Sequence, residues 1–375
     1  KNTVIFDEIE SQPQERNWLA RTFGKMEKDS LRSTIFLMMA GTMGAGVYAL
    51  HKTFDEVGIF WAIVLLVIGC VSSLLALDMY IHASRYANDP DTVSEINTAI
   101  VGKHFDIIAT VVCSIFLFLI MISFTVCISK IVFTLMCGPI KNYFKLNVDI
   151  KSVPDFMYYH KFFCLAIGLL GVGFIIPKSA DSISRFAIPC FLVHLYVIAV
   201  IVCQTYSNYQ VVKTKGFDEF NYFNTDWKKF FGNFGLAICT FNNVPNFMMV
   251  RMLVNSPSTA RLRKIFNRSN WIIMGIYILT ALCGYLSVGH QNAQPDMIIF
   301  RESNTDTDYF MNVGTFLLAL SLIVSYALLG FALKMMVVSF LPGNDVVKHV
   351  GFSFALVLTV SGIALNFDSV GAYIN

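Results

Sequence analysis

The chain has 375 residues, of which 55% are hydrophobic and only 14% are charged, and its formal net charge is +3. Soluble domains carry about 25% charged residues, so this composition excludes an ordinary soluble protein. The small net charge gives no reason to expect nucleic acid as a partner. The lipid bilayer is the solvent that such a sequence fits, and we expect an all-α, multi-pass integral membrane protein.

Residues 1–32 are polar and of mixed charge, so we interpret them as an N-terminal tail and residues 33–375 as the transmembrane domain. Lysine and arginine are more frequent on the side that carries this tail, which predicts a cytoplasmic N-terminus. The strongest contribution is a basic cluster after the sixth apolar run: Arg251, Arg261, Arg263, Lys264 and Arg268.

Nine apolar runs are long enough to be membrane helices, which need about 20 residues each. They are residues 33–50, 59–84, 107–136, 161–176, 186–206, 232–253, 271–288, 309–341 and 347–365. Residues 93–101 are too polar to span and predict an amphipathic helix at the interface. Ser369, Gly371 and Ala372 could begin another helix, so we expect the chain to contain about ten helices. We also expect the transmembrane domain to lack its last one or two helices.

The first run contains Gly41-Thr42-Met43-Gly44-Ala45-Gly46. Three glycines in six residues weaken a helix by about 1 kcal/mol each relative to alanine. In lipid, open backbone is tolerated where protein or a water-filled cavity satisfies it. The pattern is therefore consistent with a break in the helix, and equally with close helix packing through small residues.

The sixth run contains Phe241-Asn242-Asn243-Val244-Pro245-Asn246 near its middle. Pro245 removes a backbone donor and clashes with the preceding turn, and asparagine in hydrocarbon is costly unless it is paired. A break is the favoured interpretation, and a simple proline kink is the alternative.

The two breaks fall in the first and sixth runs, where two five-helix repeats would place corresponding elements. Paired interrupted helices are typical of a transporter binding site. The free amides at the start of a half-helix attract a carboxylate, and the free carbonyls at the end of another half-helix can accept from an ammonium. The pair therefore suits a zwitterion such as an amino acid.

Four stretches resemble the amino acid/auxin permease family, near its neutral amino acid transporters. They are GTMGAGVYALHKTF (41–54), TVSEINTAIVGKHF (92–105), FIIPKSADSISRFAIPCF (174–191) and GYLSVGHQNAQPDMIIF (284–300). The resemblance runs from about residue 33 to the end of the chain. It implies a leucine-transporter-like fold with eleven helices, inverted five-helix repeats and broken first and sixth helices.

The resemblance also implies which residues bind the substrate. The backbone of Thr42, Gly44, Ala45 and Gly46 would bind the carboxylate, and Phe241, Asn242 and Asn243 would contribute from the sixth helix. Ser325 aligns with a sodium-ligand threonine of the eighth helix and is a further candidate.

The sequence departs from the family at several of these positions. Ala40 stands where sodium-coupled members have an asparagine, and Ser325 stands where they have a threonine, so sodium coupling is the less favoured option. His51 replaces a usual proline, and Arg251 with Met252 stands where many members carry an acid.

Three titratable residues inside the runs, His194, Asp78 and His82, are candidates for proton coupling. His194 lies midway along the fifth run, and histidine changes charge near neutral pH. Asp78, His82 and Arg85 share one face of the second run, where a proton relay, a gate and a solvated ion-pair cluster are all open interpretations.

The sequence thus predicts a secondary active transporter of neutral or aromatic amino acids that works by alternating access, with proton symport as an option. A membrane amino-acid sensor and a transporter of drug-like amines are the alternatives, and a channel is disfavoured because no filter motif is visible. We expect no enzymatic activity, cofactor or metal site. Plasma and vacuolar or lysosome-like membranes both remain open.

Overall fold

A computed structural model describes residues 31–87, 92–136, 153–176, 186–216, 220–247, 250–251, 254, 257–290, 297–301, 308–338 and 345–365. These residues form eleven α-helices and three short 3-10 helices, and they contain no strand. The predicted tail, apart from Leu31 and Arg32, and the predicted further helix near 369–372 lie outside the described residues.

The first membrane segment is broken where the sequence predicts it. Helix α2 (Leu31–Thr42) ends at the glycine-rich stretch, Met43 and Gly44 are not helical, and the chain resumes as η1 (Ala45–Tyr48). Helix α3 (Leu50–Val57) then completes the crossing. It stops at Gly58, whose φ of 85° favours glycine. A Cβ added at this residue would lie only 2.9 Å from the Tyr222 carbonyl oxygen.

The sixth membrane segment is broken in the same way. Helix α11 (Trp227–Thr240) ends before Phe241, and residues 241–243 are not helical. The 3-10 helix η3 (Val244–Asn246) follows, with proline in its first turn, where a missing amide costs nothing. Both predicted breaks are therefore confirmed, one in the first and one in the sixth segment.

Seven further membrane segments are continuous. Within the described ranges, five helices are long and apolar enough to cross a bilayer: α4 (Ile59–Tyr86), α6 (Lys103–Leu135), α10 (Ala187–Thr214), α13 (Thr259–Val288) and α14 (Tyr309–Val338). The helices α8 (Val153–Ile175) and α15 (Asp345–Ala364) contain shorter apolar stretches. With the two broken segments, the nine predicted runs each correspond to a helical segment.

Some helices extend beyond the predicted runs. Helix α13 begins at Thr259, well before the apolar run that starts at 271, because Ser258 caps it by accepting from the Arg261 amide (3.3 Å). The first turns of α13 are charged, so we expect them to lie outside the bilayer core. Sequence hydropathy therefore finds the part of a helix that lies in the bilayer and misses the part outside it.

The predicted interfacial helix is α5 (Val93–Ile100), between α4 and α6. Thr92 caps it by accepting from the Glu95 amide (3.2 Å). Asp106 in the first turn of α6 is buried and accepts hydrogen bonds from Ser94 (2.5 Å) and Asn97 (3.4 Å). These bonds fasten α5 against α6.

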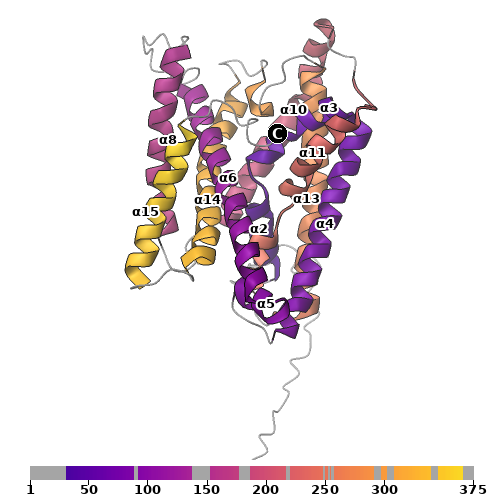
Figure 1. Cartoon of the computed structure of the whole chain (residues 1–375). Coiled ribbons are helices and arrows are strands. Elements are labelled where there is room, and N and C mark those ends of the chain that lie inside the picture. The colour runs from indigo at the N-terminus through magenta and orange to yellow at the C-terminus, as the bar shows by residue number, and fades with distance from the viewer. Residues whose placement is uncertain are drawn as a thin grey trace, which may run out of the picture.

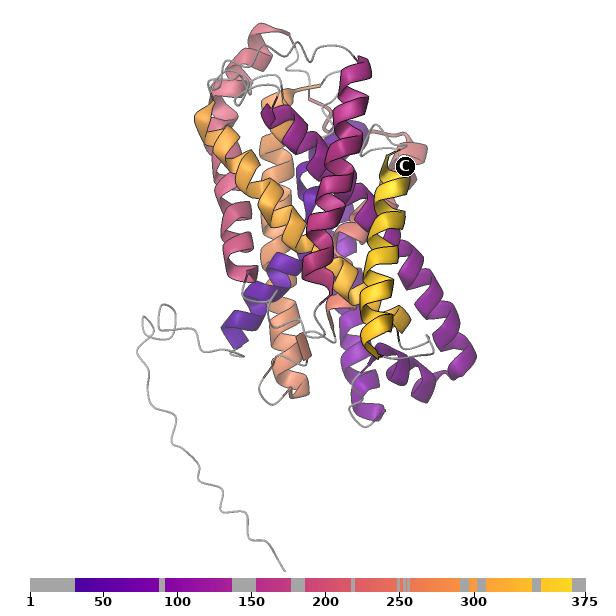
Figure 2. The ribbon, with the colours of Figure 1, turned by 90° about the vertical axis from the view of Figure 1, so that its left-hand side faces the viewer.

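The helices form two groups with the breaks between them. Helices α6, α8, α14 and α15 pack against one another, and α13 packs against α2, α3 and α4. Figure 1 shows α8 and α15 at one side of the bundle, α4 and α11 at the other, and α2 between them. Helix α10 contacts α2, α13 and α14 and so joins the groups. The side view in Figure 2 shows α15 standing beside α8.

A buried lysine closes the end of α8. Lys334 on α14 is 0% exposed, and its Nζ donates to the carbonyl oxygens of Ile175 (2.5 Å) and Ile176 (3.3 Å). The last carbonyls of a helix have no partner within the helix, and a cation at this end also interacts favourably with the negative end of the helix dipole. The end of α8 is thus completed by a side chain from α14.

Candidate functional site

The break in the first segment is lined by two glycines with different surroundings. A Cβ on Gly44 would lie 2.7 Å from Cζ of Phe124 on α6, so only glycine lets this ring rest there. A Cβ on Gly46 would meet nothing within 4 Å. There is therefore free space beside Gly46 and a closed contact at Gly44.

The predicted carboxylate-binding residues lie together at this break. Thr42 ends α2, Gly44 precedes η1 with extended backbone (φ −117°, ψ −164°), and Ala45 and Gly46 form the first turn of η1. The first amides of a helical segment have no partner within it and carry the positive end of its dipole. Thr42, Gly44 and Gly46 are partly exposed, whereas Ala45 is buried.

The break in the sixth segment is more tightly packed. Phe241 and Asn243 are both 0% exposed, and the Phe241 ring lies 5.2 Å from that of Tyr277 on α13. Asn242, between them, stays partly exposed. Ser325 is buried within α14 (5% exposed). Of the predicted residues on this side, Asn242 is the one whose side chain is accessible to a ligand.

A chain of polar groups joins the two breaks through α13. The Thr42 hydroxyl contacts Oδ1 of Asn243, and Nδ2 of Asn243 donates to Oδ1 of Asn270 (2.7 Å). The Tyr277 hydroxyl donates to the Thr42 carbonyl oxygen (3.0 Å). The Thr42 hydroxyl also lies 2.7 Å from the Met38 carbonyl oxygen, and its single proton serves one acceptor at a time.

Sequence reasoning missed Asn270, Tyr277 and Phe124. Asn270 lies just before the predicted run at 271, and the other two look like ordinary apolar-run aromatics. The signal available for Asn270 was its position at the edge of an apolar run, because an asparagine that enters the bilayer needs a hydrogen-bond partner. Nothing in the sequence shows that Phe124 covers Gly44.

His194 lies in α10 and is fully buried, at 0% exposure. Its Nδ1 is 2.9 Å from the Tyr48 hydroxyl, and its Nε2 is 3.4 Å from the Ser321 hydroxyl on α14. Tyr48 ends η1, two residues after Gly46. Hydroxyl groups can donate or accept, so these partners suit the ring with one proton or two.

Asp78 and His82 form a separate cluster on α4. The Nε of Arg263 donates to Asp78 (2.7 Å), and Nη2 of Arg263 lies 3.0 Å from Nε2 of His82. The side chains of Asp78 and His82 are 40% and 63% exposed. Arg85, expected in this cluster, instead donates to the Pro257 carbonyl oxygen. Arg263 takes its place because α13 packs against α4.

Two polar contacts lie at the opposite end of the bundle, beyond the break. Nδ1 of His290 is 2.6 Å from Oδ1 of Asp55 on α3. Arg301 is 3% exposed and donates to Ser287 (3.1 Å) and to Gln204, which in turn donates to Asp308 (2.9 and 3.0 Å). Burial lowers the pKa of Arg301 to about 10, with Asp308 opposing that shift, so the guanidinium stays charged at neutral pH.

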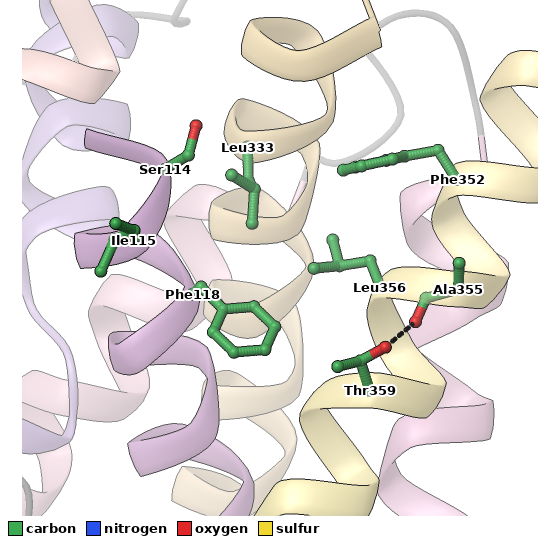
Figure 3. A pocket seen from close by; sticks show the side chains of 8 residues that line it. All are labelled: Ser114, Ile115, Phe118, Leu333, Phe352, Ala355, Leu356 and Thr359. Atoms are coloured by element: carbon green, nitrogen blue, oxygen red, sulfur yellow. Dashed lines mark hydrogen bonds between the residues drawn. The ribbon is translucent and has the colours of Figure 1, made fainter. Parts of the chain in front are cut away.

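A pocket of about 370 Å³ lies elsewhere, between α6, α14 and α15. Figure 3 shows its mainly apolar lining, including Phe118, Leu333 and Leu356, with Thr359 bonded to the Ala355 carbonyl oxygen (2.7 Å). Ile115 and Ala355 are exposed, so the pocket opens at the bundle surface. It includes none of the predicted site residues. Among the described residues, no group of three or more His, Cys, Asp or Glu could hold a metal ion.

Comparisons with known proteins agree with this geometry. A family model described as transmembrane amino acid transporter protein matches residues 27–374. A Plasmodium falciparum (isolate 3D7) protein named "Putative amino acid transporter AAT1" is 24% identical over 324 residues, which cover 86% of this chain and 50% of the relative. The Plasmodium berghei (strain Anka) protein of that name is 23% identical over 294 residues, covering 78% and 44%.

The chain therefore spans about half the length of the curated relatives it matches. Among solved structures, it is similar to MhsT in complex with L-phenylalanine, with a TM-score of 0.65 at 13% identity. The likeness covers 91% of this chain and 80% of that structure. At this identity the likeness establishes the fold alone, which is leucine-transporter-like.

Proposed function

Because the chain belongs to the family of transmembrane amino acid transporter proteins, we propose that it carries neutral or aromatic amino acids by alternating access, coupled to protons. The observation that carries this proposal is the pair of breaks, which brings open backbone of the first and sixth segments together inside a multi-pass bundle. Such a site binds a zwitterion through backbone amides and carbonyls.

The preference for an uncharged side chain rests on the residues around the breaks. Phe124, Phe241 and Tyr277 surround them, and residues 41–46 and 240–246 contain no acid or base. A cationic or anionic substrate side chain would be left without a counter-charge, which is costly away from water. The solved neighbour is in complex with L-phenylalanine, which supports an aromatic substrate for this chain.

Proton coupling is proposed at His194. Its contact with Tyr48 links a titratable group to the half-helix that begins at Gly46 (2.9 Å). Protonation would change which partner donates in that bond and so bias the position of this half-helix. Asp78 and His82 remain the second candidates, and their exposed ion-pair partners favour a structural role.

Sodium coupling has less support. Sodium is a hard cation that prefers oxygen ligands, as calcium and magnesium ions do, and Ala40 offers no side-chain oxygen before the break. Ser325 keeps a hydroxyl on α14. The cytoplasmic placement of the N-terminus is likewise a proposal, supported by the basic residues at the start of α13.

The decisive experiment is uptake of radiolabelled amino acids into proteoliposomes, tested one at a time under an inward proton gradient and under a sodium gradient. We expect accumulation of phenylalanine or other neutral amino acids that collapses with a protonophore. Specific binding without any accumulation, under every gradient, would instead identify an amino-acid sensor.

A further inference from the structure

Six aromatic rings form a continuous cluster at the end of the bundle away from Leu31. We call it the aromatic patch: Phe60, Trp61, Phe223, Trp227, Phe230 and Phe231. Neighbouring ring centroids lie 5.1–6.4 Å apart. Phe223, Trp227 and Phe231 are 59–67% exposed, and Phe60 is 47% exposed. So much exposed ring surface needs a partner.

We expect the patch to lie at a membrane interface. Phe60 and Trp61 are in the first turn of α4, one of the helices apolar enough to span the bilayer. On α11, Phe231 begins a row of exposed positions that continues through Gly235 and Ile238 and therefore faces lipid. Tryptophan and other aromatic rings concentrate at the level of lipid headgroups.

Two exposed lysines lie beside the patch. Lys228 and Lys229 are exposed, and within the described part of the chain neither has an ion-pair partner. Lys228 lies three residues before Phe231, on the same face of α11. Two carboxylates are close: Asp226 caps α11 by accepting from the Lys228 amide (2.9 Å), and the Glu56 carboxylate accepts from Asn233 (2.7 Å). Neither forms an ion pair with Lys228 or Lys229 among the described residues, so both ammonium groups are available to a phosphate beside the rings.

The patch lies over the link between the two broken segments. Asn221 donates to the Asp55 carbonyl oxygen (3.1 Å), and Asn224 donates to the Glu56 carbonyl oxygen (2.6 Å). Asn233 on α11 donates to the Glu56 carboxylate (2.7 Å). Helices α3 and α11 and the loop before α11 are thus fastened together, so the patch is connected to both broken segments.

We propose that the aromatic patch and Lys228 form a binding site for an anionic phospholipid at this interface. The rings lie among the upper acyl chains and glycerol groups, and the ammonium groups of Lys228 and Lys229 bind the headgroup phosphate and its extra negative charge. Occupancy holds α3 and α11 at a fixed depth. The consequence for transport rests on the proposed function, whereas the lipid site does not.

Tryptophan quenching tests the site directly. The full chain is reconstituted with brominated phosphatidylglycerol diluted in phosphatidylcholine, or with brominated phosphatidylcholine at the same fraction. We expect quenching that corresponds to about fivefold local enrichment of the anionic lipid per lysine. The enrichment ratio of the anionic over the neutral lipid should fall to about one in Lys228→Gln/Lys229→Gln, and in the unmodified protein it should decrease in high salt. The double substitution Trp61→Phe/Trp227→Phe removes both tryptophans of the patch and checks that the excess quenching arises there.

Lys264→Gln is the matched control, because Lys264 is also exposed but lies in α13 at the opposite end of the bundle. It should leave the excess quenching unchanged. Equal quenching by the two brominated lipids in the unmodified protein would overturn the proposal, and so would an excess that survives the double lysine substitution. A concentration-dependent loss of quenching by both lipids would overturn it in favour of a second copy covering the patch.

Uptake is then measured with and without phosphatidylglycerol. We expect the anionic lipid to change initial uptake in the unmodified protein and to have no effect in the double lysine variant. If quenching behaves as expected while no amino acid is transported in any lipid, the proposed function fails and the lipid site stands.

Discussion

The two breaks differ in what holds them open. In the first segment the chain is opened by glycine, the polar groups are backbone amides, and there is free space beside Gly46. In the sixth segment the opening is filled by side chains, with Phe241 and Asn243 fully buried and anchored on α13. The first break therefore has room for the proposed ligand, whereas the sixth is held by its contacts with α13.

The difference extends to the titratable groups. His194 reaches the first break through Tyr48 (2.9 Å), whereas the residues of the sixth break contact α13 through Asn270 and Tyr277. A change of protonation at His194 would thus be felt first by the half-helix that begins at Gly46. The variants below test this division of roles, from the largest expected effect to the smallest.

Gly46→Val fills the free space of the first break. We expect uptake to fall about 100-fold or more, because the methyl groups block two charge-assisted hydrogen bonds worth about 1.5–3 kcal/mol each. The protein should still fold, since a Cβ at this position meets nothing within 4 Å. Gly275→Val is the matched control, because that glycine is also open and lies on the exposed side of α13. Normal uptake by Gly46→Val would remove the substrate from this break.

Asn242→Ala removes the accessible side chain of the sixth break. We expect KM to rise about tenfold with little change in maximal rate, because one hydrogen bond to substrate of about 1.4 kcal/mol is lost. Initial uptake over a range of concentrations measures both quantities. A fall in maximal rate at constant KM would mean that Asn242 acts on the movement of the helix and does not bind the ligand.

His194→Gln keeps an amide that can bond to Tyr48 and Ser321 but cannot take up a proton. We expect the pH dependence of uptake between roughly pH 5 and 7 to flatten, so that uptake differs from that of the unmodified protein by a few-fold within this range while substrate binding is retained. His82→Gln is the comparison variant and should keep the normal profile. The reverse result, a flat profile for His82→Gln alone, would assign proton coupling to the Asp78 cluster.

Replacing sodium with choline should have the smallest effect. Ala40 supplies no side-chain oxygen, so we expect uptake to stay nearly unchanged at constant pH. The measurement needs no variant, only matched external buffers. A steep dependence on sodium would show that Ser325 and backbone carbonyls near the first break form an ion site by themselves.

Local chemistry explains how much of the fold the sequence predicts. Apolar runs must be helical in lipid because every backbone group needs a partner, so all nine segments are predictable. The glycines at 41–46 and Pro245 act on their own backbone, so the breaks are predictable too. Helix ends in water, such as Thr259, depend on capping residues that hydropathy does not detect.

The candidate site is less predictable because it is built between helices. That Phe124 covers Gly44, that Asn270 reaches Asn243, and that Arg263 displaces Arg85 from the Asp78 cluster all depend on which helices are neighbours. Residues far apart in the chain make these contacts, and no spacing within one helix encodes them. The backbone part of the site is local, whereas its side-chain part is tertiary.

The lysine that closes α8 also places a constraint on how the protein is made. The terminal carbonyls of α8 receive the Lys334 ammonium, yet Lys334 is synthesised about 160 residues later, on the order of ten seconds or more at about 5–20 residues per second. During that interval the last carbonyls of α8 lack this partner. We therefore expect a neutral residue at Lys334 to reduce the yield of assembled protein, measured as the fraction of expressed protein that is monodisperse after extraction.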